Sequence, residues 1–525
     1  MQPCDTSLRH CKPRNRMTSA ASSHNLAFLL LLLLFSKFAQ SRMNVSASIR
    51  IHAVPEGVTA SNDFTVQARI AGSDTWSSLP SYFVNGAEQN LTRNEFNEHP
   101  ITVSSLDYNN GPLEVQAQYK AGAVHSALIR PISLGIEATI QGDVISSTLD
   151  RQVDLMLEIN NDKWQALHLL TNEIDEDAPT KDSENVWYFG PGLNNGSAYA
   201  KVDGGNLSVP TDTTIYLDSG AFLNARILFN NISNSGIRGH GFLYDSPNGG
   251  AILIERSSNI FVEGVTALNA SGFSLTTGEA KNVHITRYRS FSSAGNGDGL
   301  DFFCSQDILA ENCFLRNSDD TLAVYGHRWD YYGETRNITL RDSVLLPNIA
   351  HPINIGTHGN PESPETLSGS HISNIDILDH DEGQMWYQGC ITIDAGDANH
   401  VQDVLVEDIR VEKITKGQLV NLRVMQNGRW TTAPGSSIRD VTFRNLELDL
   451  EHSEIVNPSQ ILGYNSTRNI QNVTFENLKV GGELVYEGMA MPRWFLVSDY
   501  VPLFANEHAL NISFKLTERN YSAQN

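Results

Sequence analysis

Three aspartates in the middle of the chain have the types and the spacing that acid–base chemistry needs. Asp298 precedes Asp319 by 21 residues, and Asp320 follows directly. If the chain coils with a period close to that spacing, the three carboxylates meet on one face of neighbouring coils. Hydrolysis of a glycosidic bond needs a proton for the departing oxygen and a base for the attacking water, and carboxyl groups can provide both. Crowding of like charges raises the pKa of at least one group and keeps it protonated.

The elements that must position these aspartates are short strands in a repeating pattern. An Asn or Asp is followed by Ile or Val and then by alternating apolar residues, beginning at Asn259, Asn282, Asp307, Asn337, Asn374, Asp403, Asp440 and Asn472. The first step is 23 residues and later steps reach 37, and the early steps are too short for β-propeller blades of about 40 residues. The pattern predicts an all-β, right-handed parallel β-helix with three short strands per coil and the insertions as loops. We expect the aligned Asn and Asp residues to form a structural ladder at the corners of the coils.

A different pattern precedes the coils. Apolar residues alternate with period two in three runs, at residues 64–70, 113–119 and 153–159. Turn residues separate these runs, so the region is predicted to be an antiparallel β-sandwich. The acidic segment 173–184 interrupts all periodicity and is interpreted as a connector. The expected domains are a signal peptide at 1–41, a β-sandwich at 42–184 and a parallel β-helix at 185–525.

The first 41 residues have the layout of a secretory signal peptide. Basic residues precede an apolar run of ten residues at 26–35, and the small residues Ala39 and Ser41 suit a processing site. Translation starts at Met1 or Met17. A bilayer requires about 20 apolar residues, and no segment of the chain is that long. We therefore expect a secreted, extracellular, soluble protein with no membrane partner.

Glycosylation signals and cysteines agree with an extracellular protein. Eleven Asn-x-Ser/Thr sequons predict N-linked glycans; they begin at Asn44, Asn90, Asn195, Asn206, Asn231, Asn269, Asn337, Asn465, Asn472, Asn511 and Asn520. Cys4 and Cys11 lie in the expected leader, which leaves Cys304, Cys313 and Cys390. An odd set allows one disulfide at most, and buried free thiols are the main expectation.

The net charge excludes one class of partner. The chain carries a net charge of −23, and residues 1–41 hold five basic and one acidic side chains, so the remainder has a net charge of −27. Such a surface repels polyanions, so a nucleic-acid partner is not expected. A highly charged pectate would need a local basic groove. We expect a monomer.

The phrases around the aspartates resemble those of two related families of glycoside hydrolases. The phrases are Asn296-Gly297-Asp298-Gly299-Leu300-Asp301, Asn317-Ser318-Asp319-Asp320 and His351-Pro352-Ile353-Asn354-Ile355-Gly356. They are similar to the polygalacturonases of family 28 and to the dextranases and isopullulanases of family 49, and the likeness covers most of residues 186–480. The resemblance implies that Asp319 is the general acid, that Asp298 and Asp320 position the water, and that His351 is the active-site histidine.

Further residues near the cluster are candidates for binding sugar. Asn296 stands in the same phrase as Asp298. The loop 325–332 is rich in aromatic residues yet too polar for a core, so Tyr325 and Trp329 are expected to stack on sugar rings. Trp386 and Tyr387 would extend that platform.

The choice of substrate depends on one departure from the family pattern. Polygalacturonases have an Arg-x-Lys pair that clamps galacturonate carboxylates, whereas this chain has Arg423 and then Met425. The missing Lys and the sandwich before the β-helix favour a dextranase- or isopullulanase-like hydrolase of a neutral or weakly acidic α-linked polysaccharide. A polygalacturonase acting on pectin is the alternative.

Two other classes of function, a lyase and a non-catalytic binding protein, are alternatives for the same residues. A β-helix polysaccharide lyase would use the acidic cluster for calcium and a basic side chain to abstract a proton. A carbohydrate-binding solenoid without activity would have no need to crowd carboxylates. The hydrolase requires neither a cofactor nor a metal.

Overall fold

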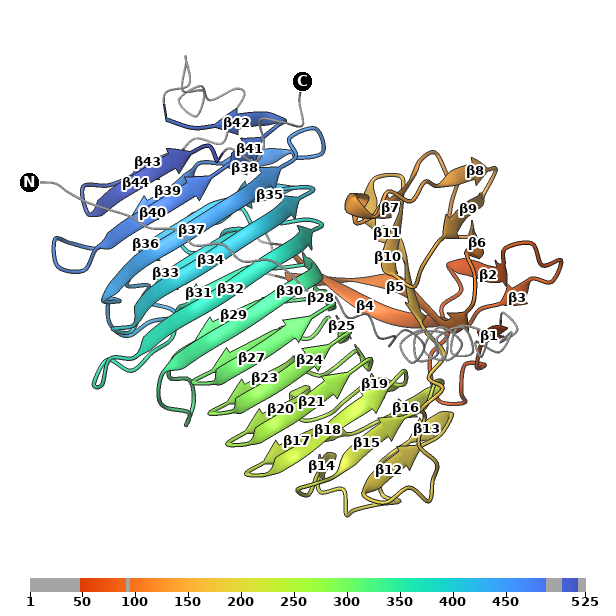
Figure 1. Cartoon of the computed structure of the whole chain (residues 1–525). Coiled ribbons are helices and arrows are strands. Elements are labelled where there is room, and N and C mark those ends of the chain that lie inside the picture. Colours follow the sequence, from red (N-terminus) through yellow and green to blue (C-terminus); the bar gives the residue numbers. More distant parts are fainter. Residues whose placement is uncertain (1–47, 91–94, 488–502, 518–525) are drawn as a thin grey trace, which may run out of the picture. The chain divides into compact units, whose positions relative to one another are not determined.

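The computed structural model describes residues 48–90, 95–487 and 503–517, and these belong to one compact unit that begins at Ser48 (Figure 1). The expected signal peptide, both sequons at Asn44 and Asn520, and the two leader cysteines lie outside the described residues. Apart from the 3-10 helix η1 (Ile132–Leu134), the regular structure there consists of strands. In this part of the chain no helix is long and apolar enough to cross a membrane.

The first strands form two facing sheets, as expected from the period-two runs. One sheet contains β1 (Ser48–Arg50), β4 (Ser81–Asn90), β5 (Glu95–Asn109), β7 (Ala127–Arg130), β10 (Asp154–Ile159) and β11 (Asp162–Asn172). The other contains β2 (Phe64–Ile70), β3 (Ser77–Ser78), β6 (Leu113–Tyr119), β8 (Thr139–Gln141) and β9 (Val144–Leu149). Side chains from both sheets, among them Val66 and Leu157, share one buried core. The pairing is antiparallel except between β5 and β11, which are parallel, so the sandwich is mixed and not purely antiparallel.

From residue 186 onward the chain forms a parallel β-helix. One 11-stranded sheet contains one strand from each coil: β14 (Asn206–Ser208), β17 (Arg226–Asn230), β20 (Gly250–Glu255), β23 (Phe273–Gly278), β26 (Leu300–Phe303), β29 (Leu322–Tyr325), β31 (Ile353–Gly356), β33 (Ile391–Ala395), β36 (Val420–Val424), β39 (Ser459–Leu462) and β43 (Leu503–Ala505). We call it the short-strand sheet.

The remaining strands of the coils form a 20-stranded sheet that bends around the other faces. In its first coils each turn contributes two strands: β12 (Val186–Phe189), β13 (Gly192–Asn194), β15 (Thr214–Leu217), β16 (Ala221–Leu223), β18 (Ser233–Gly239), β19 (Phe242–Tyr244), β21 (Ser258–Glu263), β22 (Thr266–Leu268), β24 (Lys281–Thr286), β25 (Arg289–Phe291), β27 (Gln306–Glu311) and β28 (Phe314–Asn317). Later coils contribute longer strands and the closing ones: β30 (Thr335–Pro347), β32 (Thr366–Ile377), β34 (His400–Val411), β37 (Ser437–Leu448), β40 (Ile470–Glu476), β41 (Leu478–Val480), β42 (Glu483–Val485) and β44 (Ala509–Lys515). β35 (Lys416–Gln418) and β38 (Ile455–Asn457) pair separately.

Alternation along the short-strand sheet decides which side chains enter the interior. Val324, Ile355 and Ile393 stand at matching register positions and are fully buried in one core that runs through the coils. Their neighbours on either side in sequence therefore point away from that core. The outward positions form two columns of side chains: one includes Asp301, Ala323, Asn354, Thr392 and Asn421, and the other includes Phe303, Tyr325, Gly356, Asp394 and Arg423.

The polar ladder is confirmed, and it runs in two columns. Asn282 donates to Asn259 (2.7 Å), Asn337 to Asp307 (2.8 Å), and the backbone of each is left-handed. Asn and Asp tolerate that conformation better than other residues with a Cβ. Asn374 instead donates to Asp342 (2.6 Å) in a second column. The first column continues through Gly369, whose φ is +71°, because glycine adopts positive φ without steric cost.

Cys304, Cys313 and Cys390 are unpaired and buried. Cys313 and Cys390 lie in the core of the coils, and Cys304 packs with Phe303 and Tyr325. The expectation of buried free thiols is confirmed.

Candidate functional site

The carboxylate cluster lies at the entry to neighbouring strands of the short-strand sheet. Asp298, Asp320 and His351 each stand two residues before a strand, namely β26, β29 and β31. Leu300, Leu322 and Ile353 begin those strands and pair in register. The three side chains therefore occupy equivalent positions on successive coils, and Asp319 lies one residue earlier than Asp320.

The expected convergence of the three aspartates is present. One carboxylate oxygen from each of Asp298, Asp319 and Asp320 lies within 4.8 Å of the others. Asp298 and Asp320 are buried, whereas Asp319 is partly exposed. This separation is shorter than the roughly 6.5 to 9.5 Å between carboxyl groups that leaves room for a water molecule in an inverting pair. Such a cluster can share protons or hold a cation, because both arrangements relieve the repulsion of like charges.

Asp320 is held as an ionised carboxylate by hydrogen bonds on both oxygens. Its Oδ1 accepts from the His351 Nδ1 (2.5 Å) and backbone N–H (3.1 Å). Its Oδ2 accepts from the Tyr325 hydroxyl (2.9 Å) and the Asn354 amide (3.0 Å). Burial alone would raise the pKa of Asp320, but the charge of His351 and these hydrogen bonds lower it.

His351 is fully buried and has a partner on each ring nitrogen. Beyond the bond to Asp320, Nε2 lies 3.3 Å from the Tyr387 carbonyl oxygen. The Tyr387 ring meets the imidazole edge to face at 4.7 Å. Burial would lower the pKa of His351, but the Asp320 charge and hydrogen bond raise it. A protonated imidazole donates to both acceptors at once.

Asp319 and Asp298 have the opposite electrostatic environment. Burial and the neighbouring Asp320 charge raise the pKa of Asp319 to about 7. Burial and the charges of Asp301, Asp319 and Asp320 raise the pKa of Asp298 well above its usual range. Oδ1 of Asp298 has no hydrogen-bond partner among the described residues. One carboxylate of the cluster is thus ionised and the others favour the protonated form.

The structure corrects the expected aromatic platform. Trp329 is exposed and lies edge-on to Phe273 and Phe303, each at 5.3 Å. Tyr325, in contrast, is buried with its ring stacked on Phe303. Its hydroxyl supports Asp320, so Tyr325 lies beneath the cluster and cannot form a surface for a sugar ring.

The pair Trp386 and Tyr387 divides in the same way. Trp386 is exposed, and Tyr387 is buried against His351. Asn296, the remaining candidate for sugar binding before the cluster, is exposed with a left-handed φ of +52° two residues before Asp298.

Arg423 lies two strands beyond β31 and is largely buried. Its guanidinium stacks on Trp386 at 4.9 Å and donates to Gln460. It pairs in register with Asp394, and neither oxygen of Asp394 has a hydrogen-bond partner among the described residues. Burial raises the pKa of Asp394 to about 8, despite the nearby charges of His351 and Arg423.

Sequence reasoning did not assign roles to several side chains of this site. Asp301 and Asn354 lie within the motif phrases and point outward in the same column. Burial and the charges of Asp320 and Asp319 raise the pKa of Asp301 well above its usual range. Alternation within each phrase was a signal that could have found both. Asp394 lies outside the motif phrases, and its place near the site follows only from the register of the coils.

Comparisons with known proteins agree with this architecture. The model described as glycosyl hydrolases family 28 matches residues 212–489, which is more than half of the 525 residues. A polygalacturonase from Juniperus ashei is 28% identical over 218 residues, which cover 40% of this chain and 39% of that protein. A polygalacturonase from Chamaecyparis obtusa is 27% identical over 204 residues, which cover 37% of this chain and 36% of that protein. The chain thus spans about two fifths of the length of these curated relatives.

Among solved structures, Dex49A from Penicillium minioluteum is similar in fold. The TM-score is 0.54, with 13% sequence identity over 88% of this chain and 95% of that protein. Its fold matches across both the sandwich and the coils. From the match of the family model over the coils that carry the cluster, we conclude that the chain belongs to glycosyl hydrolases family 28.

Proposed function

We propose that this protein hydrolyses O-glycosidic bonds of a polysaccharide, with Asp319 as the proton donor and with Asp298 and Asp320 placing the attacking water. The observation that carries the proposal is the convergence of three carboxylates, in which Asp320 is bound by His351, Tyr325 and Asn354. Asp319 has a pKa of about 7, whereas the pKa of Asp320 is lowered by its contact with His351. Neighbouring acids whose environments separate their pKa values are typical of acid–base pairs in glycosidases.

In the proposed reaction, the Asp319 carboxyl proton moves to the glycosidic oxygen as the bond from that oxygen to the anomeric carbon breaks. Water adds to the anomeric carbon, and its proton passes to a carboxylate of the cluster. Asp320 is a poor nucleophile because hydrogen bonds to both carboxylate oxygens hold the side chain in place. A group so engaged can orient water but cannot approach a sugar carbon. We therefore propose inversion, although the carboxylates are closely spaced.

Stereochemistry provides a direct test of that step. Proton NMR of the first product should show the anomer opposite to the substrate linkage. A retained anomer would indicate a covalent intermediate on one carboxylate, which the close spacing permits, and would refute the water-placing role of Asp320.

For the substrate we propose a neutral or weakly acidic α-linked polysaccharide. Asp394 stands on β33, three coils beyond β26, the strand that follows Asp298, at an outward position where a basic residue would favour a polyuronide. Arg423, the cation in register with Asp394, is already engaged by Gln460 and Trp386. A carboxylate of the substrate beside Asp394 would therefore find the Arg423 guanidinium already engaged.

The alternative substrate is polygalacturonate, which the names of the curated relatives favour. A reducing-sugar screen of the secreted protein against dextran, pullulan and polygalacturonate separates the two, with Asp319→Asn as the blank. New reducing ends from polygalacturonate alone would support the alternative.

A cation held by the cluster would support a lyase. Three carboxylate oxygens within 4.8 Å of one another are compatible with calcium binding. Activity that is lost with a chelator and gives unsaturated products would establish the lyase and overturn the hydrolase. Binding of polysaccharide without any product would establish a non-catalytic solenoid.

We also propose that the protein is secreted as a glycosylated monomer. Asn195 and Asn231 are exposed sequons outside the ladder bonds, so their amides are accessible to a glycan. The amides of Asn337, Asn472 and Asn511 instead donate along the ladder. Mass spectrometry of glycopeptides should find Asn195 and Asn231 modified more fully than these three.

A further inference from the structure

A loop between β32 and β33, residues 378–390, covers His351 and is called here the Tyr387 loop. The Tyr387 carbonyl oxygen lies 3.3 Å from His351 Nε2. The Tyr387 hydroxyl accepts from the Asn354 amide at 3.1 Å. His351 and Asn354 both hydrogen-bond to Asp320, so the Tyr387 loop holds in place two of the side chains that bind this carboxylate.

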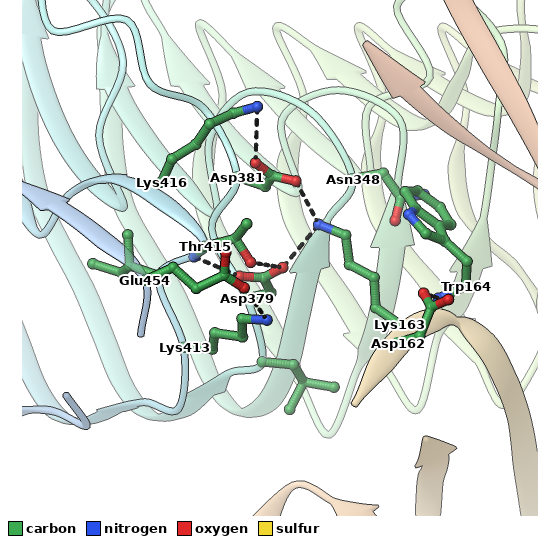
Figure 2. A network of polar contacts seen from close by, with 12 residues as sticks. Asp162, Lys163, Trp164, Asn348, Asp379, Asp381, Lys413, Thr415, Lys416 and Glu454 are labelled. Carbon is green, nitrogen blue, oxygen red and sulfur yellow. Dashed lines mark hydrogen bonds and ion pairs between the residues drawn. The ribbon is translucent and has the colours of Figure 1, made fainter. Parts of the chain in front are cut away.

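The beginning of the Tyr387 loop is held by a side chain from the sandwich. Lys163 lies on β11, and its Nζ donates to Asp379 (2.8 Å) and Asp381 (3.0 Å). Figure 2 shows the ammonium group of Lys163 reaching from the sandwich to a point between the two carboxylates. Lys163 is thus one cation shared by two acids at the start of the loop.

Further contacts fix Asp379 and Asp381 to the neighbouring coil. Asp379 also accepts from the Thr415 backbone N–H (3.1 Å) and hydroxyl (3.0 Å). Lys416 lies 3.2 Å from the other oxygen of Asp381. Asp379 is 1% exposed and Lys163 10% exposed, so water screens the ion pair poorly. Burial would lower the pKa of Lys163, but Asp379 and Asp381 raise it, so the cation persists.

The distance along the chain from this anchor to the site is short. Only five residues lie between Asp381 and Tyr387. Removal of Lys163 would leave the buried Asp379 carboxylate without its hydrogen-bonded cation, and movement of the start of the loop toward water would relieve the cost of that buried charge. Displacement there would reach Tyr387 and the two hydrogen bonds that it makes over Asp320.

We infer that Lys163 is a positioning residue through which the sandwich holds the Tyr387 loop against His351. The inference rests on the proposed function of the cluster. It assigns to the sandwich a role in the reaction that is distinct from binding the polysaccharide.

The test compares Lys163→Met with Asp107→Asn in the full-length protein. Asp107 on β5 pairs with His240 (3.1 Å), so that variant also weakens a contact between the sandwich and the coils. His240 lies between β18 and β19. The next strand of the short-strand sheet is β20, two coils before β26, the strand that follows Asp298. Both variants test the cost of a lost contact to the sandwich, but only Lys163→Met releases the Tyr387 loop.

We expect Lys163→Met to lower kcat by about 10- to 100-fold with a smaller change in KM, as a misplaced catalytic group would. Lys163→Arg, which keeps the charge, should restore most of kcat. Asp107→Asn should keep kcat within about twofold of wild type at a temperature where both variants are folded. Equal loss of kcat in the two variants, or a wild-type kcat in Lys163→Met, would overturn the inference.

Hydrogen exchange separates this inference from the proposed function. Amides of residues 382–389 should exchange faster in Lys163→Met than in wild type and Asp107→Asn. A wild-type protein without hydrolytic activity would refute the proposed function. The exchange measurement would still test whether Lys163 positions the loop. Unchanged exchange in the loop would refute the positioning role, whatever the activity.

Discussion

At the ladder corner, Asn and Asp side chains of successive coils pair as donor and acceptor: Asn337 donates to Asp307 and Asn472 donates to Asp440. At the entry to the short-strand sheet, the same register brings Asp298 beside Asp320. There a carboxylate meets a carboxylate and no amide stands between them. Parallel coils place equivalent residues in a column. Where amides and acids alternate, the column stabilises the fold through hydrogen bonds; where acids are adjacent, at least one of them favours the protonated form.

The largest effect is expected from replacing an acid of the cluster by its amide. Asp319→Asn and Asp298→Asn should each lower kcat by roughly 10² to 10⁴-fold, because each removes one proton-transfer role at constant volume. Circular dichroism should show unchanged folding. More than about a tenth of the wild-type rate in Asp319→Asn, on a substrate with a poor leaving group, would show that another group is the acid.

The pH dependence of activity follows from the opposite shifts in the cluster. Asp319 must be protonated and has a pKa of about 7, so kcat/KM should fall as the pH rises through about 7. Asp320 must be ionised and its pKa is lowered, so activity should persist below pH 4. A rate that rises through pH 7 would reverse the roles.

The same shift predicts a change in stability. The folded-state pKa of Asp319 is raised above its unfolded value, so its stabilising contribution is complete below about pH 4 and is lost as the pH rises through about 7. Asp319→Asn should therefore raise the Tm relative to wild type at pH 8 and have little effect at pH 4. The gain at pH 8 is at most about 4 kcal/mol, since one pKa unit corresponds to about 1.4 kcal/mol. A thermal melt at both pH values measures the difference.

A smaller effect is expected when an acid is placed in the ladder. Asn282→Asp removes the donor to Asn259 and sets a carboxylate beside Asp307. Loss of one exposed hydrogen bond and a like-charge contact should cost about 1 kcal/mol of unfolding free energy. Chemical denaturation should report that loss, while kcat stays within about twofold of wild type. A large loss of kcat would mean that the polar ladder and the carboxylate cluster are not independent.

The smallest expected effect concerns salt. If the substrate is neutral, its KM should change by less than about twofold between 0.05 and 0.5 M salt, because the ligand has no charge to screen. Arg423→Ala should then weaken binding by about 1 to 3 kcal/mol, as the loss of hydrogen bonds and stacking would. A tenfold rise of KM for polygalacturonate in wild type, absent in Arg423→Ala, would restore the pectin substrate.

Sequence reasoning reached the parts of the molecule that depend on periodicity. The period-two runs gave the sandwich strands, and the 21-residue spacing brought Asp298, Asp319 and Asp320 together. The domain boundaries stay predictions. Asn374 lies in a different ladder column from Asn337 because coils lengthen by insertion, and a dipeptide phrase does not report register. Tyr325 was expected on the surface because the loop after it is polar, whereas Tyr325 itself ends a strand and follows the alternation of that strand.

Contacts between distant segments could not be predicted in this way. The bonds from Lys163 to Asp379 and Asp381 join residues more than 200 positions apart. The unpartnered carboxylate of Asp394 becomes visible only when β33 is placed beside β31 and β36. Both depend on how coils stack and on where the sandwich packs, which no local pattern encodes.

The matched register of β26, β29 and β31 also bears on how such an enzyme could diversify. Hydrogen bonds along these strands fix the spacing of Asp298, Asp320 and His351 independently of the length of the connections between coils. Segments such as 326–334 and 357–365 can therefore grow, shrink or be exchanged between homologues without moving the reacting groups. Directed evolution restricted to those segments should yield variants with new sugar preferences and an unchanged pH profile, and recombination at coil boundaries should preserve activity more often than recombination within a coil.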